Sequence, residues 1–451
     1  MFNCVKHTTY IMWWFACALI AGSLPLALAS CAQYEKSNVF IGTGGLAYGY
    51  GGINPGVSYP SGALRLGPDT TDSVADIGYR HFSGYNYQDG MIRAFSHTHL
   101  VGAGINDLGF FGAMPTRVTR DFNHEDDLII WSGINEKNLT VETRAWWSPF
   151  QKSNENGLPG QYNCTLDKPK VNVNLLATST LTAIHKYTFL SEESNNPFSP
   201  GIVLDVCHAA QITEGIYRDS TCRDAKISIS DDLTSFTASV YFSNKFYIYI
   251  YGEFSEAASE WRTCSNEAGL ACTNGLVMVS DNGILFSRVL FGKSRRESIV
   301  ELRVALSFIS ADQARLNFKD LKHASFELSR LQTTEAWCSV LNKMEISPLD
   351  GDEDIEHILH SANYRIALTP AIYTEAGGVY LGIDKEIHSV NERNYSNSPS
   401  ANANEYYSDY SFWDTFRSLH PYILLVDEAK AVGILRSVGE MTVQNQGYPK
   451  W

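Results

Sequence analysis

Residues 95–109, FSHTHLVGAGINDLG, combine two histidines one residue apart with three glycines and an aspartate. On a strand covering about 92–100, His97 and His99 would point to the same face, because side chains alternate with period two. Such a pair can bind a metal ion or hydrogen-bond to sugar hydroxyls, and Gly102 would let the backbone approach a ligand closely. The competing interpretation is a half-buried strand whose histidines bond to backbone carbonyls.

A second candidate lies in residues 405–421, EYYSDYSFWDTFRSLHP. A helix that begins near Ser411 would place Trp413 and Asp414 in its first turn, beside unpaired backbone N–H groups. An indole can stack on a pyranose ring while a neighbouring carboxylate accepts protons from its hydroxyls. Asp414 and Arg417 share one helix face, so the alternative is a helix cap with an intrahelical ion pair.

Composition narrows the class of protein. The 451 residues are 44% apolar, which is typical of a globular chain, and carry a net charge of -14. That charge argues against a nucleic-acid partner, because binding to phosphates needs clustered Lys and Arg. The glycine-rich residues 40–70 lack the G-x-x-x-x-G-K-[ST] pattern, so a nucleotide-binding loop is excluded there.

The first 30 residues are typical of a secretory signal peptide: Lys6 precedes an apolar run that ends in small residues. The same end matches a bacterial lipoprotein signal, in which Cys31 would carry the lipid anchor and the protein would be periplasmic or a surface lipoprotein. No later segment is apolar and long enough to span a membrane. Seven cysteines follow residue 30. In an oxidising compartment some should pair, Cys264 with Cys272 closing the shortest loop, and one is left over.

The pattern of elements changes near Ser310. Before it, runs such as 139–147, 181–190, 236–254, 283–291 and 298–310 alternate apolar with polar residues and predict a large antiparallel β-sandwich. After it, SADQ reads as a capping box that opens a helix reaching about residue 341. Further helices are predicted at 352–368, 411–426 and 427–443, with a hairpin over 372–384 that turns at Gly377 and Gly378.

Six segments resemble glycoside hydrolase family 92, the calcium-dependent exo-acting α-mannosidases, and occur in that family's order: NVFIGTGG, YPSGALRLGPDT, GYRHFSGYNYQDGMIRAFSHTHLVGAGINDLG, YLGIDKEIH, YSFWDTFRSLHP and GYPKW. After the signal peptide (1–30), the resemblance implies a β-sandwich (31–310), a helical linker (311–345) and an incomplete (α/α)6 catalytic domain (346–451). It also implies Ca²⁺ as cofactor and mannose-containing glycans or glycoproteins as partners. The implied substrate-binding residues, facing a terminal mannose, are His97, His99, Gly102, Trp413, Asp414 and Arg417.

The implied activity is that of an α-1,2-mannosidase type that removes terminal mannose from N-glycans or mannans by inversion. The resemblance further implies that the general acid, the general base and most calcium ligands lie beyond residue 451. We therefore assign no catalytic and no metal-binding residue within the chain, and expect it to release no mannose. Two alternatives remain: a glycan-binding protein without catalysis, and an amidase-type protein that removes N-glycans.

Overall fold

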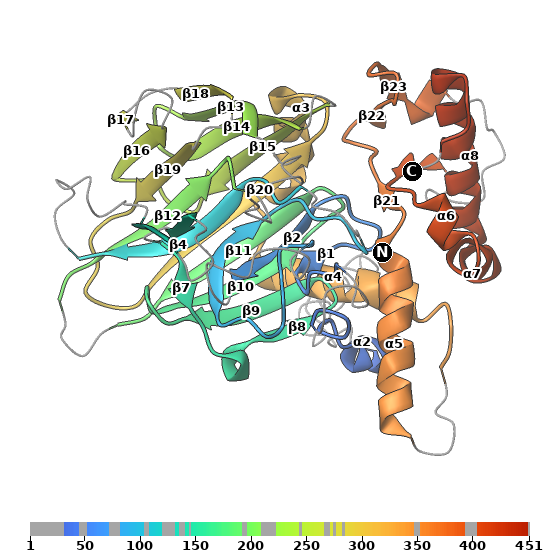
Figure 1. Ribbon diagram of the computed structural model, residues 1–451, viewed down its shortest axis with the longest axis horizontal. Helices are drawn as coiled ribbons and strands as arrows, with labels where there is room; N and C mark the ends of the chain where they lie inside the picture. Colours follow the sequence, from blue (N-terminus) through green and yellow to red (C-terminus); the bar gives the residue numbers. More distant parts are fainter. Residues whose placement is uncertain are drawn as a thin grey trace, which may run out of the picture.

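The structure is a computed structural model (Figure 1). It describes residues 31–44, 52–71, 82–102, 108–119, 131–134, 140–143, 146–191, 196–208, 222–242, 246–265, 271–273, 277–281, 285–346, 352–392 and 404–449. Figure 1 shows stacked sheets with the helical region beside one end of the stack.

Two antiparallel sheets form the sandwich, each with nine described strands. The first sheet has the order β1 (Val57–Ser58), β2 (Arg65–Thr71), β3 (Met91–Ser96), β4 (Gly112–Val118), β12 (Ser199–Asp205), β19 (Leu285–Leu290), β16 (Glu260–Ser265) and β17 (Ala271–Thr273), with β7 (Ser148–Pro149) on β3. The second has the order β18 (Val277–Asp281), β13 (Cys222–Ile229), β14 (Ser235–Phe242), β15 (Phe246–Phe254), β20 (Ser298–Ser307), β11 (Thr182–Phe189), β10 (Val171–Ala177), β9 (Gln161–Leu166) and β8 (Asn156–Leu158). A separate hairpin joins β5 (Trp131–Ile134) to β6 (Thr140–Thr143).

The main core lies between these sheets. In β10, Val171, Val173 and Leu175 are buried, while the two asparagines between them are partly exposed. This alternation is what a strand with one solvated face requires. Rings from opposite sheets also meet, since Phe95 of β3 and Tyr162 of β9 have centroids 6.4 Å apart.

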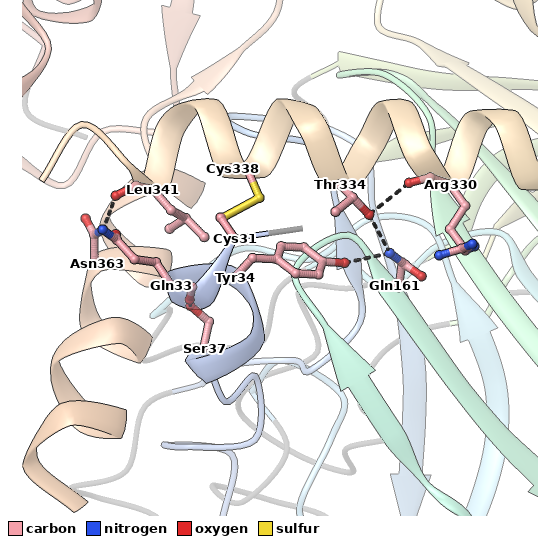
Figure 2. The surroundings of a disulfide bond; sticks show 10 residues. All are labelled: Cys31, Gln33, Tyr34, Ser37, Gln161, Arg330, Thr334, Cys338, Leu341 and Asn363. Atoms are coloured by element: carbon pink, nitrogen blue, oxygen red, sulfur yellow. Dashed lines mark hydrogen bonds between the residues drawn. A yellow bond between two sulfur atoms is a disulfide. The ribbon is translucent and has the colours of Figure 1, made fainter. Parts of the chain in front are cut away.

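Short helices connect the sandwich to the rest of the chain. Helix α3 (Ala311–Phe318) leads through a 3₁₀ turn (Lys319–Leu321) into α4 (Phe326–Leu341). A second 3₁₀ turn (Lys152–Asn154) precedes β8. The N-terminal helix α2 (Ala32–Lys36) is tied to α4 by a disulfide between Cys31 and Cys338. Figure 2 shows this disulfide and, beside it, Gln161 of β9 bonded to Thr334 of α4 at 3.1 Å.

The C-terminal region is helical with small two-stranded sheets. Its elements are α5 (Glu353–Leu368), β21 (Ala371–Ile372), β22 (Val379–Leu381), β23 (Ile387–Ser389), a 3₁₀ turn (Val390–Glu392), β24 (Tyr407–Ser408), α6 (Phe412–Thr415), α7 (Leu419–Val426) and α8 (Glu428–Asn445). Helix α5 starts at Asp352, whose side chain accepts from the backbone N–H of Asp354 and Ile355. Aromatic residues, including Tyr380 and Tyr406 stacked at 3.8 Å, form a separate core here.

The predicted fold class is confirmed, an antiparallel sandwich followed by a helical region. Several boundaries were wrong. The run 236–254 is the hairpin of β14 and β15, the helix predicted from Ser310 to about 341 breaks into α3 and α4, and the one over 411–426 breaks into α6 and α7. The turn at Gly377 and Gly378 is present, but the paired strands are β22 and β23. Within the described ranges, no helix is both long and apolar enough to cross a membrane.

Candidate functional site

The predicted strand over 92–100 is shorter than expected, because β3 ends at Ser96. His97 and His99 therefore lie in the loop that follows the strand. Both are buried, with exposures of 1% and 2%. Their side chains bond to different partners, so they do not form one His-x-His pair directed at a common ligand.

His97 belongs to a chain of neutral hydrogen bonds inside the sandwich. Its Nδ1 donates to the carbonyl of Phe111, and its Nε2 lies 2.9 Å from His185 Nε2. Tyr187 in turn donates to His185 Nδ1 at 2.7 Å. Burial lowers the pKa of His97 to about 4 and that of His185 well below its usual range. Both imidazoles are thus neutral at physiological pH, His185 donating to His97.

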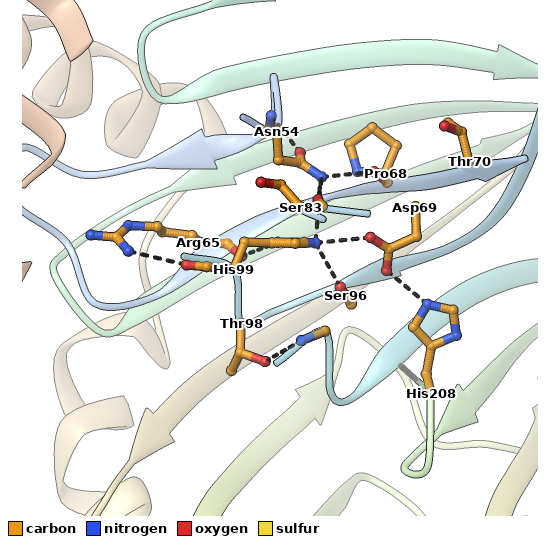
Figure 3. A network of polar contacts seen from close by, with 12 residues as sticks. Asn54, Arg65, Pro68, Asp69, Thr70, Ser83, Ser96, Thr98, His99 and His208 are labelled. Atoms are coloured by element: carbon orange, nitrogen blue, oxygen red, sulfur yellow. Dashed lines mark hydrogen bonds and ion pairs between the residues drawn. The ribbon is translucent and has the colours of Figure 1, made fainter. Parts of the chain in front are cut away.

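His99 is held between a backbone carbonyl and a buried carboxylate (Figure 3). Its Nδ1 lies 2.9 Å from the carbonyl oxygen of Arg65, and its Nε2 lies 2.9 Å from Asp69 Oδ1. Both partners can only accept, so His99 donates from both ring nitrogens. This is the backbone-carbonyl arrangement of the competing structural interpretation, extended by a carboxylate from β2.

Asp69 joins two histidines from distant parts of the chain. The other carboxylate oxygen of Asp69, Oδ2, lies 2.7 Å from His208 Nε2, and Asp69 is 0% exposed. Burial alone would raise the pKa of Asp69, but the charge of His99 and the hydrogen bonds from both histidines hold it well below its usual range. Burial alone would lower the pKa of His208. Its hydrogen bonds to Asp205 and Asp69 outweigh burial, so the pKa of His208 is raised above its usual value.

The loop after His99 is built by backbone bonds. Thr98 Oγ1 accepts from the N–H of Phe110 at 2.9 Å, which closes the loop at its far end. Gly102 has φ of +74°, a conformation that favours glycine, and its N–H donates to the carbonyl of Gly52. A Cβ on Gly102 would meet no atom within 4 Å, so the backbone angle and not space accounts for this glycine. Residues 103–107 of the opening stretch lie outside the described residues.

The predicted helix start near Ser411 is present, since α6 begins at Phe412 with Ser411 as its N-cap. Trp413 is 66% exposed. Asp414 Oδ2 accepts from Ser411 Oγ at 2.6 Å. Arg417 lies over the ring of Phe416 at 5.5 Å, so the structure pairs Asp414 with a hydroxyl in place of the alternative ion pair. The indole and a fixed carboxylate are therefore presented together at an exposed helix start.

Arg65 connects the two predicted parts of the site. Its guanidinium donates to the carbonyl of His99 at 3.1 Å and lies 2.7 Å from Asp409, just before α6. Whether the histidine loop and the Trp413–Asp414 helix converge on one sugar stays a prediction.

Four further residues organise this region and were not predicted as site residues: Arg65, Asp69, His185 and His208. Arg65 and Asp69 stand within the quoted segment YPSGALRLGPDT, but the two histidines are isolated in the sequence and carry no spacing signal.

No arrangement of three or more His, Cys, Asp or Glu side chains that could hold a metal ion occurs among the residues with described positions. Calcium as a cofactor stays a prediction.

The described part of the chain is thus a β-sandwich joined to a helical region, with an exposed Trp413 and a fixed Asp414 in α6. Residues 38–307 match the glycosyl hydrolase family 92 N-terminal domain, and residues 313–451 match the family 92 catalytic domain. The chain belongs to glycoside hydrolase family 92.

Solved structures agree in fold. The family GH92 α-mannosidase BT3965 from Bacteroides thetaiotaomicron is 22% identical with a TM-score of 0.72, over 91% of this chain and 50% of that one. The inverting mannosidase BT2199 from the same species is 22% identical with a TM-score of 0.70, over 93% of this chain and 49% of that one. The chain spans about half the length of these structures. A comparison with curated proteins gave no match.

Proposed function

We propose that this chain binds the terminal α-linked mannose of N-glycans or mannans, as part of an α-mannosidase-type glycoside hydrolase. The family membership of both its domains carries the proposal. The exposed Trp413 beside a fixed Asp414 supports it, because an indole face and a carboxylate are what recognition of a pyranose requires. The matches to both family 92 domains give no support to the amidase alternative.

The roles of the proposed sugar ligands follow from their surroundings. Ser411 occupies Oδ2 of Asp414 and fixes the orientation of the carboxylate, so Oδ1 is the oxygen directed at a sugar hydroxyl. Trp413 supplies the stacking surface. His97 and His99 support the loop through its backbone, because their ring nitrogens are bonded within the protein. Gly102 contributes its backbone to the same loop. Arg417 lies over the ring of Phe416, just after α6.

The proposed reaction is hydrolysis with inversion. An inverting glycosidase places a general acid on the leaving oxygen and a general base on a water at the opposite face, with carboxyl groups roughly 6.5–9.5 Å apart. We assign neither group to a residue of this chain. Calcium is the cofactor expected from the family, and it would hold and polarise oxygens of the sugar. The expected specificity is for α-1,2-linked mannose.

Calorimetric titration of the purified chain with methyl α-D-mannopyranoside tests the proposal. We expect saturable binding that Asp414→Ala weakens about 10- to 100-fold, because a hydrogen bond to a charged group contributes roughly 1.5–3 kcal/mol. Asp312→Ala is the matched control, since Asp312 also lies in the first turn of a helix but pairs with Arg315 on an exposed surface. Absence of mannoside binding by the unaltered chain would refute the proposal.

Mannose release from α-1,2-mannobiose, measured with and without Ca²⁺, tests the expectation that this chain releases no mannose. Binding without release agrees with both remaining functions. Release that depends on Asp414 would contradict the expectation and favour the glycosidase over the glycan-binding alternative.

We also propose that the protein follows the secretory route. Two disulfides, Cys31–Cys338 and Cys264–Cys272, support an oxidising compartment, and Cys207 is disulfide-bonded as well. A lipid anchor would need the sulfur of Cys31, so the Cys31–Cys338 bond supports a protein without that anchor. Mass spectrometry of the mature N-terminal peptide distinguishes the disulfide from the lipidated cysteine.

A further inference from the structure

A buried ion pair joins the sandwich to the segment that leads into α6. Arg65, the first residue of β2, places Nη1 2.7 Å from Asp409 Oδ2, and the two side chains are only 7% and 9% exposed. The guanidinium and the carboxylate form an ion pair, but their relative orientation does not make a hydrogen bond to Asp409 Oδ2. Since a buried charge without a partner is strongly unfavourable, each of these residues fixes the position of the other.

The guanidinium of Arg65 collects three segments that are distant in sequence. Nη1 also donates to the carbonyl of His99 at 3.1 Å, and Nη2 donates to the carbonyl of Leu368 at the end of α5, also at 3.1 Å. The backbone carbonyl of Arg65 accepts from His99 in return. The histidine loop, the end of α5 and Asp409 are therefore held at one point.

Asp409 is placed to control the start of α6. It has φ of +75°, a conformation that a residue other than glycine keeps only when its surroundings enforce it. Tyr373 donates to its second oxygen at 3.4 Å. Only Tyr410 separates Asp409 from the N-cap Ser411, and a helix of four residues such as α6 cannot fix its own position.

A neighbouring cation makes Asp409 harder to replace. Lys430 of α8 is buried and donates to the carbonyl of Thr369 at 3.1 Å. Burial lowers the pKa of Lys430 to about 7, and the charge of Arg65 contributes in the same direction. Without Asp409, the guanidinium of Arg65 would lose its ion-pair partner while staying buried near Lys430.

We infer that Arg65 and Asp409 are positioning residues for the sugar site: their ion pair sets the Trp413–Asp414 helix start in register with the His97–Gly102 loop. The inference rests on the proposed mannose-binding function of Trp413 and Asp414. The Arg65–Asp409 pair therefore affects ligand affinity in addition to the stability of the fold.

Three variants of the full chain test the inference: Arg65→Lys, Asp409→Asn and Glu375→Gln. Glu375 is the matched control, because it is also a buried carboxylate between the C-terminal region and the sandwich. It accepts from the N–H of Phe308 and from Asn317, each at 2.8 Å, but does not lead into α6. Arg65→Lys keeps the charge and removes the fork that reaches several acceptors, so it is the variant expected to fold most readily.

All three variants should lower Tm. Only Arg65→Lys and Asp409→Asn should also weaken binding of methyl α-D-mannopyranoside, by at least about 10-fold, and speed amide hydrogen exchange over residues 411–417. Equal affinity in all three variants, at reduced Tm, would show that the pair serves stability alone. If the unaltered chain bound no mannoside, the proposed function would fail, and the exchange over 411–417 would decide the positioning role separately. Unchanged exchange in Asp409→Asn would then overturn it.

Discussion

Asp69 is the residue on which the buried polar network of the sandwich depends. It is fully buried and meets His99 and His208 at 2.9 and 2.7 Å. Asp69→Asn removes the charge and turns one acceptor into a donor facing a histidine, so we expect a loss of about 3–5 kcal/mol in the free energy of unfolding. Urea unfolding measures this. Asp312→Asn, on an exposed helix turn, should leave stability nearly unchanged. A similar small effect for Asp69→Asn would show that the network contributes little.

His97 makes stability depend on pH. Its pKa in the folded protein is about 4, lowered by burial, against about 6.5 when unfolded. Between these values the unfolded chain holds a proton that the folded chain does not, so the free energy of unfolding falls as the pH falls. The slope is about 1.4 kcal/mol per pH unit for each such histidine. His185 acts in the same direction, since its pKa is lowered too.

The raised pKa of His208 has the opposite sign: its stabilisation is present below its unfolded pKa and is lost as the pH rises through the folded value. Urea unfolding at pH 7 and pH 5 tests the balance. We expect lower stability at pH 5, and a smaller difference between the two values in His97→Gln. An unchanged dependence in His97→Gln would refute the assignment.

The residues of this network show where sequence reasoning about a site stops. The spacing of His97 and His99 permits both a ligand site and a structural pair, and the structure gives both histidines buried partners. Asp69 lies 30 residues from His99, and His185 lies 88 residues from His97. His208, which bonds to Asp69, lies 139 residues from it. Local spacing carries no information about such contacts, because the pairing of strands in the sheets creates them.

At the level of elements, the clearest local signal was the capping box at Ser310. The N-cap half of this box is present, since Ser310 Oγ accepts from the N–H of Gln313 at 3.0 Å. The reciprocal bond is replaced, because the N–H of Ser310 donates to Ser307 Oγ and the Gln313 amide donates to the carbonyl of Ala376. Ser310→Ala should therefore lower the free energy of unfolding by about 1 kcal/mol. Ser325, the N-cap of α4, makes no such side-chain bond, so Ser325→Ala is the matched control and should cost little. Equal losses in the two variants, measured by thermal unfolding, would show that the cap of α3 contributes nothing specific.

Strands with a clear apolar pattern were predicted, including β19, which is buried at every position and lies within the run 283–291, but two other fully buried strands were not. β11 and β20 lie within predicted runs, since their sequences alternate. β2 and β12 are buried at every position and contain glycine or proline, so they show no alternation to detect. The single run 236–254 contains both β14 and β15, which pair antiparallel with Tyr241 opposite Tyr247.

At the level of the whole molecule, the N-terminal segment acts as a strap across the joint between the sandwich and the helices. Lys36 of α2 pairs with Glu356 of α5, and Tyr34 accepts from Gln161 of β9 at 2.6 Å. Burial raises the pKa of Tyr34 to about 12, so its phenol stays neutral and can keep this bond. The Cys31–Cys338 disulfide makes the attachment covalent (Figure 2). Helix α2 thereby connects β9 of the sandwich, α4 and α5, through residues remote in sequence from Arg65 and Asp409.

The two disulfides should contribute unequally to stability. Cys31 and Cys338 are 307 residues apart, whereas Cys264 and Cys272 are only 8 apart. In the chain-entropy model a cross-link is worth about 3 kcal/mol for a loop of roughly 15 residues and about 4.7 kcal/mol for roughly 100. We therefore expect Cys31→Ser with Cys338→Ser to lower the free energy of unfolding, measured in urea, by about 3 kcal/mol more than Cys264→Ser with Cys272→Ser. The long cross-link should also protect α2 from proteolysis, which the short one cannot do. Equal losses in both pairs, with α2 equally resistant, would mean that packing of α2 holds the strap without the disulfide.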